Sequence, residues 1–189
     1  MYLSGAKNDA IRDDLAAGTI GLLNTPKNAY NLDGVAVWAM DNGCYTGSYP
    51  GHKEYLALLE RLADHRDRCL FVAAPDVVGD GAATLAVLQP MASHIRALGW
   101  PVALVGQDDM ENMTVPWDDV DWLFVGGSTE WKLGAGAETL IRQAQAHGKR
   151  VHVGRINSGT RFRHFRALGC STKTAWRRFP PTGSRPNSR

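Results

Sequence analysis

The chain has 189 residues, of which 44% are hydrophobic and 21% are charged, as in an ordinary soluble globular protein. This length fits one domain with a sizeable core, and the formal net charge of +2 is too small to indicate a binding partner. The three cysteines are far apart and form no CxxC pair or Cys/His cluster. The composition therefore indicates neither a disulfide framework nor a metal site.

The sequence shows no signal peptide and no apolar run long enough to span a bilayer, so we expect a cytoplasmic protein with no membrane partner. Residues 173–189 contain five cationic side chains and no acidic one. We expect this segment to be a basic, disordered tail. It could bind phosphates, although a frayed, solvated terminus is the simpler interpretation.

In chain order, short apolar runs alternate with segments of helical periodicity. The runs predict strands over residues 2–4, 35–40, 70–74, 102–105, 122–125 and 151–154, with a last strand beginning at Cys170. The periodic segments predict helices over residues 9–17, 52–66, 82–98, 137–147 and 160–168. Between them, the breakers Pro26, Asn28, Asn31 and Gly34 predict a long loop over residues 19–34.

This alternation predicts an α/β fold with a parallel sheet and right-handed crossovers. Six or seven strands fall short of a full eight-stranded barrel, which usually needs about 200 residues or more. We therefore predict a reduced or incomplete TIM-like (β/α) barrel with parallel strands over residues 1–172. A doubly wound open sheet is the alternative.

Five predicted strands deliver polar residues or glycines at the same end. The stretch LFVAAPDVVGD, residues 70–80, places Asp76 just beyond a buried strand. The other endings are DNG at 41–43, GQD at 106–108, GGST at 126–129 and RINS at 155–158. Active sites of α/β barrels and open α/β sheets lie at this rim, so the five endings indicate a shared site.

Asp41 and Asp76 are the leading candidates for catalysis, because partly shielded carboxylates can exchange protons near neutrality. Capping of the following turn or helix is the alternative role for each. Gln107 offers a donor and an acceptor, suited to the edge of a planar ring or to a hydrogen bond within its loop.

The loop of Gly126, Gly127 and Ser128 could bring backbone N–H groups close to a ligand or a phosphate. Trp131 and Lys132 follow it and could stack on a base or contact a phosphate, although Trp131 could equally pack against the barrel. Candidates for sugar or phosphate contacts further along are Arg155, Asn157 and Ser158. His152 lies within a predicted strand, where we expect it to be packed.

Together these endings resemble the tRNA-guanine transglycosylase superfamily, most closely its compact DpdA-like branch from phages and bacterial genomic islands. The matching stretches are MDNGCY (40–45), APDVVGD (74–80), LVGQD (104–108), PWDDVDWLFVGGSTEWKLG (116–134) and GKRVHVGRINS (148–158). The resemblance implies a barrel enzyme, a pentosyltransferase, that exchanges guanine in DNA for a 7-deazaguanine base without a cofactor. RNA is a second potential polymer, and partner proteins of a DNA-modification system are expected in a bacterial or phage-infected cell.

By motif, Asp41 resembles the family's general acid/base, while Asp76 and Gln107 would read the edge of the purine. The resemblance also implies backbone contacts from Gly126 and Gly127 to the base. The full predicted base-binding set is Asn42, Gln107, Gly126, Gly127 and Ser128, and the predicted sugar-phosphate set is Lys132, Arg155, Asn157 and Ser158. Chemically, an aspartate would displace the base at the anomeric carbon and then be displaced by the incoming base.

The chain departs from the family pattern in two places. It lacks the three-Cys, one-His zinc site of the classical branch, which fits the compact branch. Residues 169–176 read GCSTKTAW where compact members usually have a segment like GCDSxDGT, and no aspartate follows Asp121. Either Asp41 or Asp76 then serves as the nucleophile, or glycosyl transfer has been lost.

The alternative functions are a phosphosugar-type barrel enzyme, which would use the GGST loop to bind phosphate, and a non-catalytic nucleic-acid-binding accessory protein, which would use the basic tail.

Overall fold

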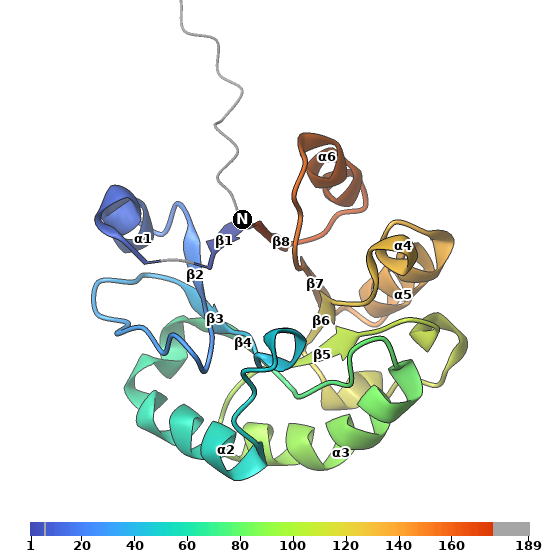
Figure 1. The fold of residues 1–189 in the computed structure, drawn as a ribbon, viewed down its shortest axis with the longest axis horizontal. Helices are drawn as coiled ribbons and strands as arrows, with labels where there is room; N and C mark the ends of the chain where they lie inside the picture. Colours follow the sequence, from blue (N-terminus) through green and yellow to red (C-terminus); the bar gives the residue numbers. More distant parts are fainter. Residues whose placement is uncertain (6, 176–189) are drawn as a thin grey trace, which may run out of the picture.

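The computed structural model describes residues 1–5 and 7–175. Eight parallel strands form a closed barrel and follow chain order around the ring (Figure 1). They are β1 (Tyr2–Ser4), β2 (Gly21–Asn24), β3 (Trp38–Met40), β4 (Cys69–Ala73), β5 (Val102–Gly106), β6 (Trp122–Val125), β7 (Arg150–Val153) and β8 (Thr172–Ala175). The predicted TIM-like barrel is confirmed, and the ring is closed rather than incomplete.

Helices surround the ring on its outer side (Figure 1). The α-helices are α1 (Arg12–Ala16), α2 (His52–Arg61), α3 (Gly81–Ala97), α4 (Thr129–Lys132), α5 (Ala135–Ala146) and α6 (Gly159–Ala167). Short 3₁₀ turns are η1 (Asp9–Ile11), η2 (Cys44–Thr46), η3 (Ala63–Arg68), η4 (Met110–Asn112) and η5 (Trp117–Asp119). No helix lies between β2 and β3, where all of residues 25–37 are described.

The number of strands differs from the expectation because β2 lies inside the predicted loop over residues 19–34. The strand has only two apolar side chains, Leu22 and Leu23, between Gly21 and Asn24, which is too short a run to show a pattern. Both leucines are buried, Leu22 among the residues outside the ring and Leu23 among those inside it.

Pairing of β1 with β8 closes the ring, with Leu3 opposite Thr174. The sequence predicts a tail from residue 173, but β8 runs to Ala175 and includes Lys173. The Lys173 side chain is buried, and its Nζ donates to the Cys170 carbonyl oxygen at 2.7 Å. The barrel therefore includes residues 173–175, and the rest of the predicted tail, 176–189, lies outside the described residues.

The core is divided into two layers by the alternation of side chains along each strand. Inward side chains, including Phe71, Trp122 and Phe124, fill the bore, whereas their neighbours face the helices. The ring of Phe71 lies 5.1 Å from that of Trp122 and 6.0 Å from that of Phe124, measured between centroids. This packing closes the bore, so the open space lies above it, at the carboxyl rim of the strands.

Candidate functional site

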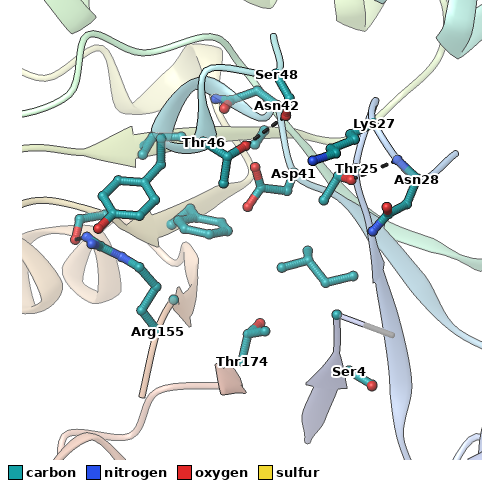
Figure 2. A pocket seen from close by; sticks show the side chains of 18 of the residues that line it. Ser4, Thr25, Lys27, Asn28, Asp41, Asn42, Thr46, Ser48, Arg155 and Thr174 are labelled. Carbon is teal, nitrogen blue, oxygen red and sulfur yellow. Dashed lines mark hydrogen bonds between the residues drawn. The ribbon is translucent and has the colours of Figure 1, made fainter. Parts of the chain in front are cut away.

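A cavity of about 630 Å³ lies at the carboxyl rim of the barrel (Figure 2). This volume is within the usual range for small-molecule sites. The end of every strand contributes to its lining, through Gly5, Thr25, Asp41, Asp76, Gln107, Gly126, Arg155 and Thr174. The shared rim site predicted from the strand endings is therefore a single cavity.

Asp76 is held from two sides by amide groups. Asn42 Nδ2 donates to its Oδ1 at 2.7 Å, and Gln107 Nε2 donates to its Oδ2 at 2.6 Å. Both amides are fixed in turn. Asn42 also donates to the Ala74 carbonyl at 2.6 Å, and Gln107 Oε1 accepts from the Gly79 N–H at 2.9 Å. The orientation of the Asp76 carboxylate is therefore set by the protein.

These bonds define what Asn42 and Gln107 do in the described structure. Both line the cavity, as expected for base-binding residues. However, the Asn42 Oδ1 accepts from the Cys44 N–H at 2.8 Å, and both groups of the Gln107 amide are already bonded. Both side chains position Asp76, and their direct contact with a base stays a prediction.

Asp41 has fewer partners than Asp76. Its Oδ1 accepts from the Gly43 N–H at 2.8 Å, the local bond that the capping interpretation predicts. The carboxylate also points into the cavity, with Lys27 on one flank and Thr174 across from it (Figure 2). Among the described residues, its second oxygen accepts no hydrogen bond and is available to a ligand.

Both carboxyl groups have pKa values above the ordinary value, chiefly because burial disfavours the charged form. The Gly43 N–H bond and the charge of Arg155 oppose the rise in the pKa of Asp41. At Asp76 the bond from Asn42 opposes it, whereas the charge of Asp41 adds to it. A negative charge on Asp41 therefore disfavours a second negative charge on Asp76.

Arg155 follows β7 and lies across the wall of the cavity. Its Nη2 donates to the carbonyl oxygens of Gly126 at 3.2 Å and Gly127 at 2.5 Å, and its guanidinium lies 3.9 Å from the ring centroid of Tyr45. Its backbone has a φ of +59°, unusual for a residue with a side chain. These contacts fix the guanidinium at the rim.

The glycine loop after β6 differs from the loop that the sequence predicts, in which backbone N–H groups would face a ligand. Gly126 and Gly127 line the cavity, but their carbonyls face Arg155, and the Gly126 N–H donates to the Gly106 carbonyl at 3.0 Å. At Gly127 a Cβ atom would lie 2.3 Å from Trp131 Cε3. The close approach that requires glycine here is to Trp131, which packs against the core.

Ser128 and Lys132 lie outside the main cavity. The Ser128 N–H donates to Asp108 Oδ1 at 2.7 Å, and its Oγ caps α4 by accepting from the Trp131 N–H at 3.1 Å. Lys132 is only 6% exposed, and its Nζ donates to the Gly154 carbonyl at 2.9 Å. Burial, together with the charges of Arg155 and Arg161, lowers the pKa of Lys132 to about 7, and the charge of Asp108 opposes this shift.

A second, smaller cavity of about 230 Å³, here called the side pocket, adjoins the first. Lys132, Arg155 and Asn157 of the predicted sugar-phosphate set line it, together with Arg161, which the sequence analysis did not single out. Ser158 lines neither cavity and caps α6 by accepting from the Arg161 N–H at 3.2 Å. The predicted set is therefore divided between a pocket and a helix cap.

Two further parts of the main cavity were missed. Thr25, Lys27 and Asn28 line it from the connection between β2 and β3, which could be recognised only once β2 was known. Thr174 lines it from β8, and its hydroxyl is hydrogen-bonded to His152 Nε2 at 2.9 Å. His152 is fully buried, as expected, and burial holds its pKa well below the ordinary value.

Two broader properties can be stated for residues 1–5 and 7–175. No group of three or more His, Cys, Asp or Glu side chains there could hold a metal ion. None of the helices in this part of the chain combines the length and the hydropathy needed to cross a membrane.

No family model matches the chain, and no curated protein matches it. Among solved structures it is similar to a chain of the tryptophan synthase complex from Pyrococcus furiosus, at 13% identity and a TM-score of 0.49, over 92% of this chain and 84% of that one. It is also similar to 3-hexulose-6-phosphate synthase, at 12% identity and a TM-score of 0.46, over 92% and 88%. At these values the likenesses carry no functional argument, and the fold assignment rests on the closed ring of parallel strands itself.

Proposed function

We propose that the barrel is a transglycosylase that exchanges guanine in DNA for a 7-deazaguanine base, with Asp41 as the reacting carboxylate. The observation that supports this best is the different surroundings of two carboxylates on one cavity. Asp76 is held at both oxygens by Asn42 and Gln107, whereas Asp41 has one backbone partner and points into the open space.

In this proposal Asp76 recognises the base. Its orientation is fixed, and its remaining lone pairs can accept from the N–H groups along the edge of a guanine-type ring. Asn42 and Gln107 act through Asp76 as positioning residues. Val105 and Phe124 line the same cavity and offer an apolar surface to the face of the ring.

Asp41 then reacts at the sugar. Its carboxylate forms a bond to the anomeric carbon as the bond from that carbon to guanine breaks, and guanine leaves with the electron pair and takes up one proton. The incoming base gives up one proton and displaces the carboxylate, so the exchange is balanced. The reaction needs Asp41 ionised, and the positive charge of Arg155 favours that form against the effect of burial.

The test is release of labelled guanine from single-stranded DNA in the presence of 7-cyano-7-deazaguanine, since a base within a duplex must first be unstacked. We expect Asp41→Asn to lower the rate by about a hundredfold or more. The matched control is Asp118→Asn, an exposed carboxylate before β6, at the opposite end of the barrel. It should leave the rate unchanged. No release by the wild-type protein, or equal rates for both variants, would refute the proposal.

A phosphosugar-type barrel enzyme is the second candidate, and the side pocket favours it. Lys132, Arg155 and Arg161 line this pocket, and a phosphate would lie there rather than on the GGST loop, whose Ser128 N–H is already bonded to Asp108. This candidate predicts binding of small phosphorylated sugars and indifference to DNA. The non-catalytic DNA-binding alternative depends on the tail, which lies outside the described residues.

A further inference from the structure

The side pocket brings together three cationic side chains from three separate elements. Lys132 comes from α4, Arg155 from the turn after β7, and Arg161 from the first turns of α6. Asn157 and Thr129 add polar groups to the lining, and the remaining lining residues are Tyr45, Leu133, Ile156 and Phe165. No acidic residue is among them.

Among the described residues, Asp41 acts on Arg155 and Asp108 acts on Lys132 through their charges, but neither carboxylate forms an ion pair with these cations. The ion pairs among residues 1–5 and 7–175 involve other side chains, and no carboxylate lies within ion-pair distance of Lys132, Arg155 or Arg161. Lys132 Nζ has one hydrogen-bond acceptor, the Gly154 carbonyl, for its three possible donors. Like charges gathered in a partly buried pocket repel one another, and an anion placed among them removes that cost.

We propose that the side pocket binds a phosphate group, carried either by a phosphate monoester or by a phosphodiester. Arg161 supplies forked N–H donors that suit phosphate oxygens, Arg155 supplies its charge and the N–H groups that do not bond the glycine carbonyls, and Lys132 supplies a point charge. The volume of about 230 Å³ has room for a phosphate with several waters, given that one water takes about 30 Å³ of liquid. An anion beside Lys132 also favours its protonated form, which burial alone disfavours.

The position of the pocket relates this phosphate to the main cavity. Tyr45 and Arg155 line both spaces, so this stacked pair forms their common wall. A ligand whose sugar lies at Asp41 could place its phosphate on the other side of Arg155. That role as the sugar-phosphate subsite of base exchange rests on the proposed function, whereas binding of phosphate itself does not.

The first test is a calorimetric titration of the full chain with inorganic phosphate, which measures the binding affinity. We expect Arg161→Gln to weaken the affinity by about tenfold, because a charge-assisted hydrogen bond is lost. Arg161 is half-buried and its backbone N–H keeps its cap, so the variant should fold, which a melting curve checks. Arg163→Gln is the matched control, because this exposed arginine lies on the same helix and lines neither cavity.

Competition identifies the source of the phosphate. Displacement of inorganic phosphate by ribose 5-phosphate supports the pocket as a monoester site, and displacement by a short single-stranded oligodeoxynucleotide supports it as a phosphodiester site. Absence of phosphate binding to the wild-type protein, or equal affinities for Arg161→Gln and Arg163→Gln, overturns the proposal. Phosphate binding without guanine release would refute base exchange alone, so the two failures can be told apart.

Discussion

Asp41 and Asp76 illustrate what single residues contribute to this site. Both are aspartates beyond a strand end, yet one is held by two amide side chains and the other by one backbone N–H. The sequence places both at the rim, because a polar residue after a buried strand is a local pattern. It could not show that Asn42 and Gln107 converge on Asp76, because these partners are 34 and 31 residues away along the chain.

The raised pKa of Asp41 predicts a stability effect. Because folding raises this pKa, the ionised carboxylate destabilises the folded state at neutral pH. The penalty disappears as the pH falls below the ordinary value of 3.8, where the group is protonated in both states. We expect Asp41→Asn to raise the melting temperature at pH 7, with a gain that shrinks toward pH 4.

Thermal melts from pH 4 to pH 8 check this expectation, with Asp118→Asn as the exposed control. An Asn at position 41 can still accept from the Gly43 N–H, so the local turn is retained. A gain of the same size at every pH would contradict the burial argument. The combination of higher stability and lost activity is the usual trade-off at a functional carboxylate.

At the scale of elements, the turn from β6 into α4 determines how the two cavities are separated. Gly127 has a φ of +48°, and Trp131 lies over its Cα while donating from Nε1 to Glu111 Oε2 at 2.8 Å. The hydrogen bond to Glu111 holds the Nε1 edge of the indole, so the ring cannot move freely away from Gly127. A side chain at position 127 would displace the turn whose carbonyls hold Arg155.

Comparison of Gly127→Ala with Gly34→Ala separates the backbone strain of an alanine at positive φ from the steric clash of its methyl group with Trp131. Both positions have a positive φ, which costs an alanine about 1–2 kcal/mol, but a Cβ at Gly34 would meet nothing within 4 Å. We expect both variants to melt at lower temperatures, and Gly127→Ala to lose clearly more. Chemical or thermal unfolding measures the difference. Equal losses would mean that the turn adapts to the extra atom.

The elements that the sequence predicts best are those with long periodic patterns. The helix expected over residues 82–98 is α3, and Asp80 caps it by accepting from the Ala83 N–H at 2.9 Å. The short elements β2 and α4 have four residues each and show no period. Burial of Lys132 on α4 could not be predicted either, because the sequence around it contains no signal for the packing that covers it.

At the scale of the whole molecule, closure of the ring depends on its last strand. β8 pairs with β1 on one side and with β7 on the other, and Thr172 and Thr174 hold His152 in the bore. Parallel pairing of the first strand with the last joins segments that are distant along the chain. Residues 171–175, STKTA, are mostly polar, so the sequence indicates a last strand only because it follows the predicted helix, and it does not indicate the two neighbours of that strand.

Two shortened chains test the importance of this strand. A chain ending at Ala175 keeps all eight strands and should unfold cooperatively near the temperature of the full chain. A chain ending at Ser171 lacks β8, exposes both neighbouring strands, and should lose its cooperative transition. Circular dichroism during heating distinguishes them, and similar melts for both would show that β8 is dispensable. Any test of DNA binding by the tail must therefore cut after Ala175.

The common wall of Tyr45 and Arg155 has a consequence for selectivity under the proposed assignments. A ligand that occupies only the main cavity, or only the side pocket, gains the contacts of one space. A nucleotide carries both a base with its sugar and a phosphate. Once one of these groups is bound, the other is held at a high effective concentration near its own site, so the nucleotide loses translational freedom only once while it makes both sets of contacts. The barrel would then bind free bases and free phosphate weakly and the joined molecule tightly, which selects a nucleotide over its separate components.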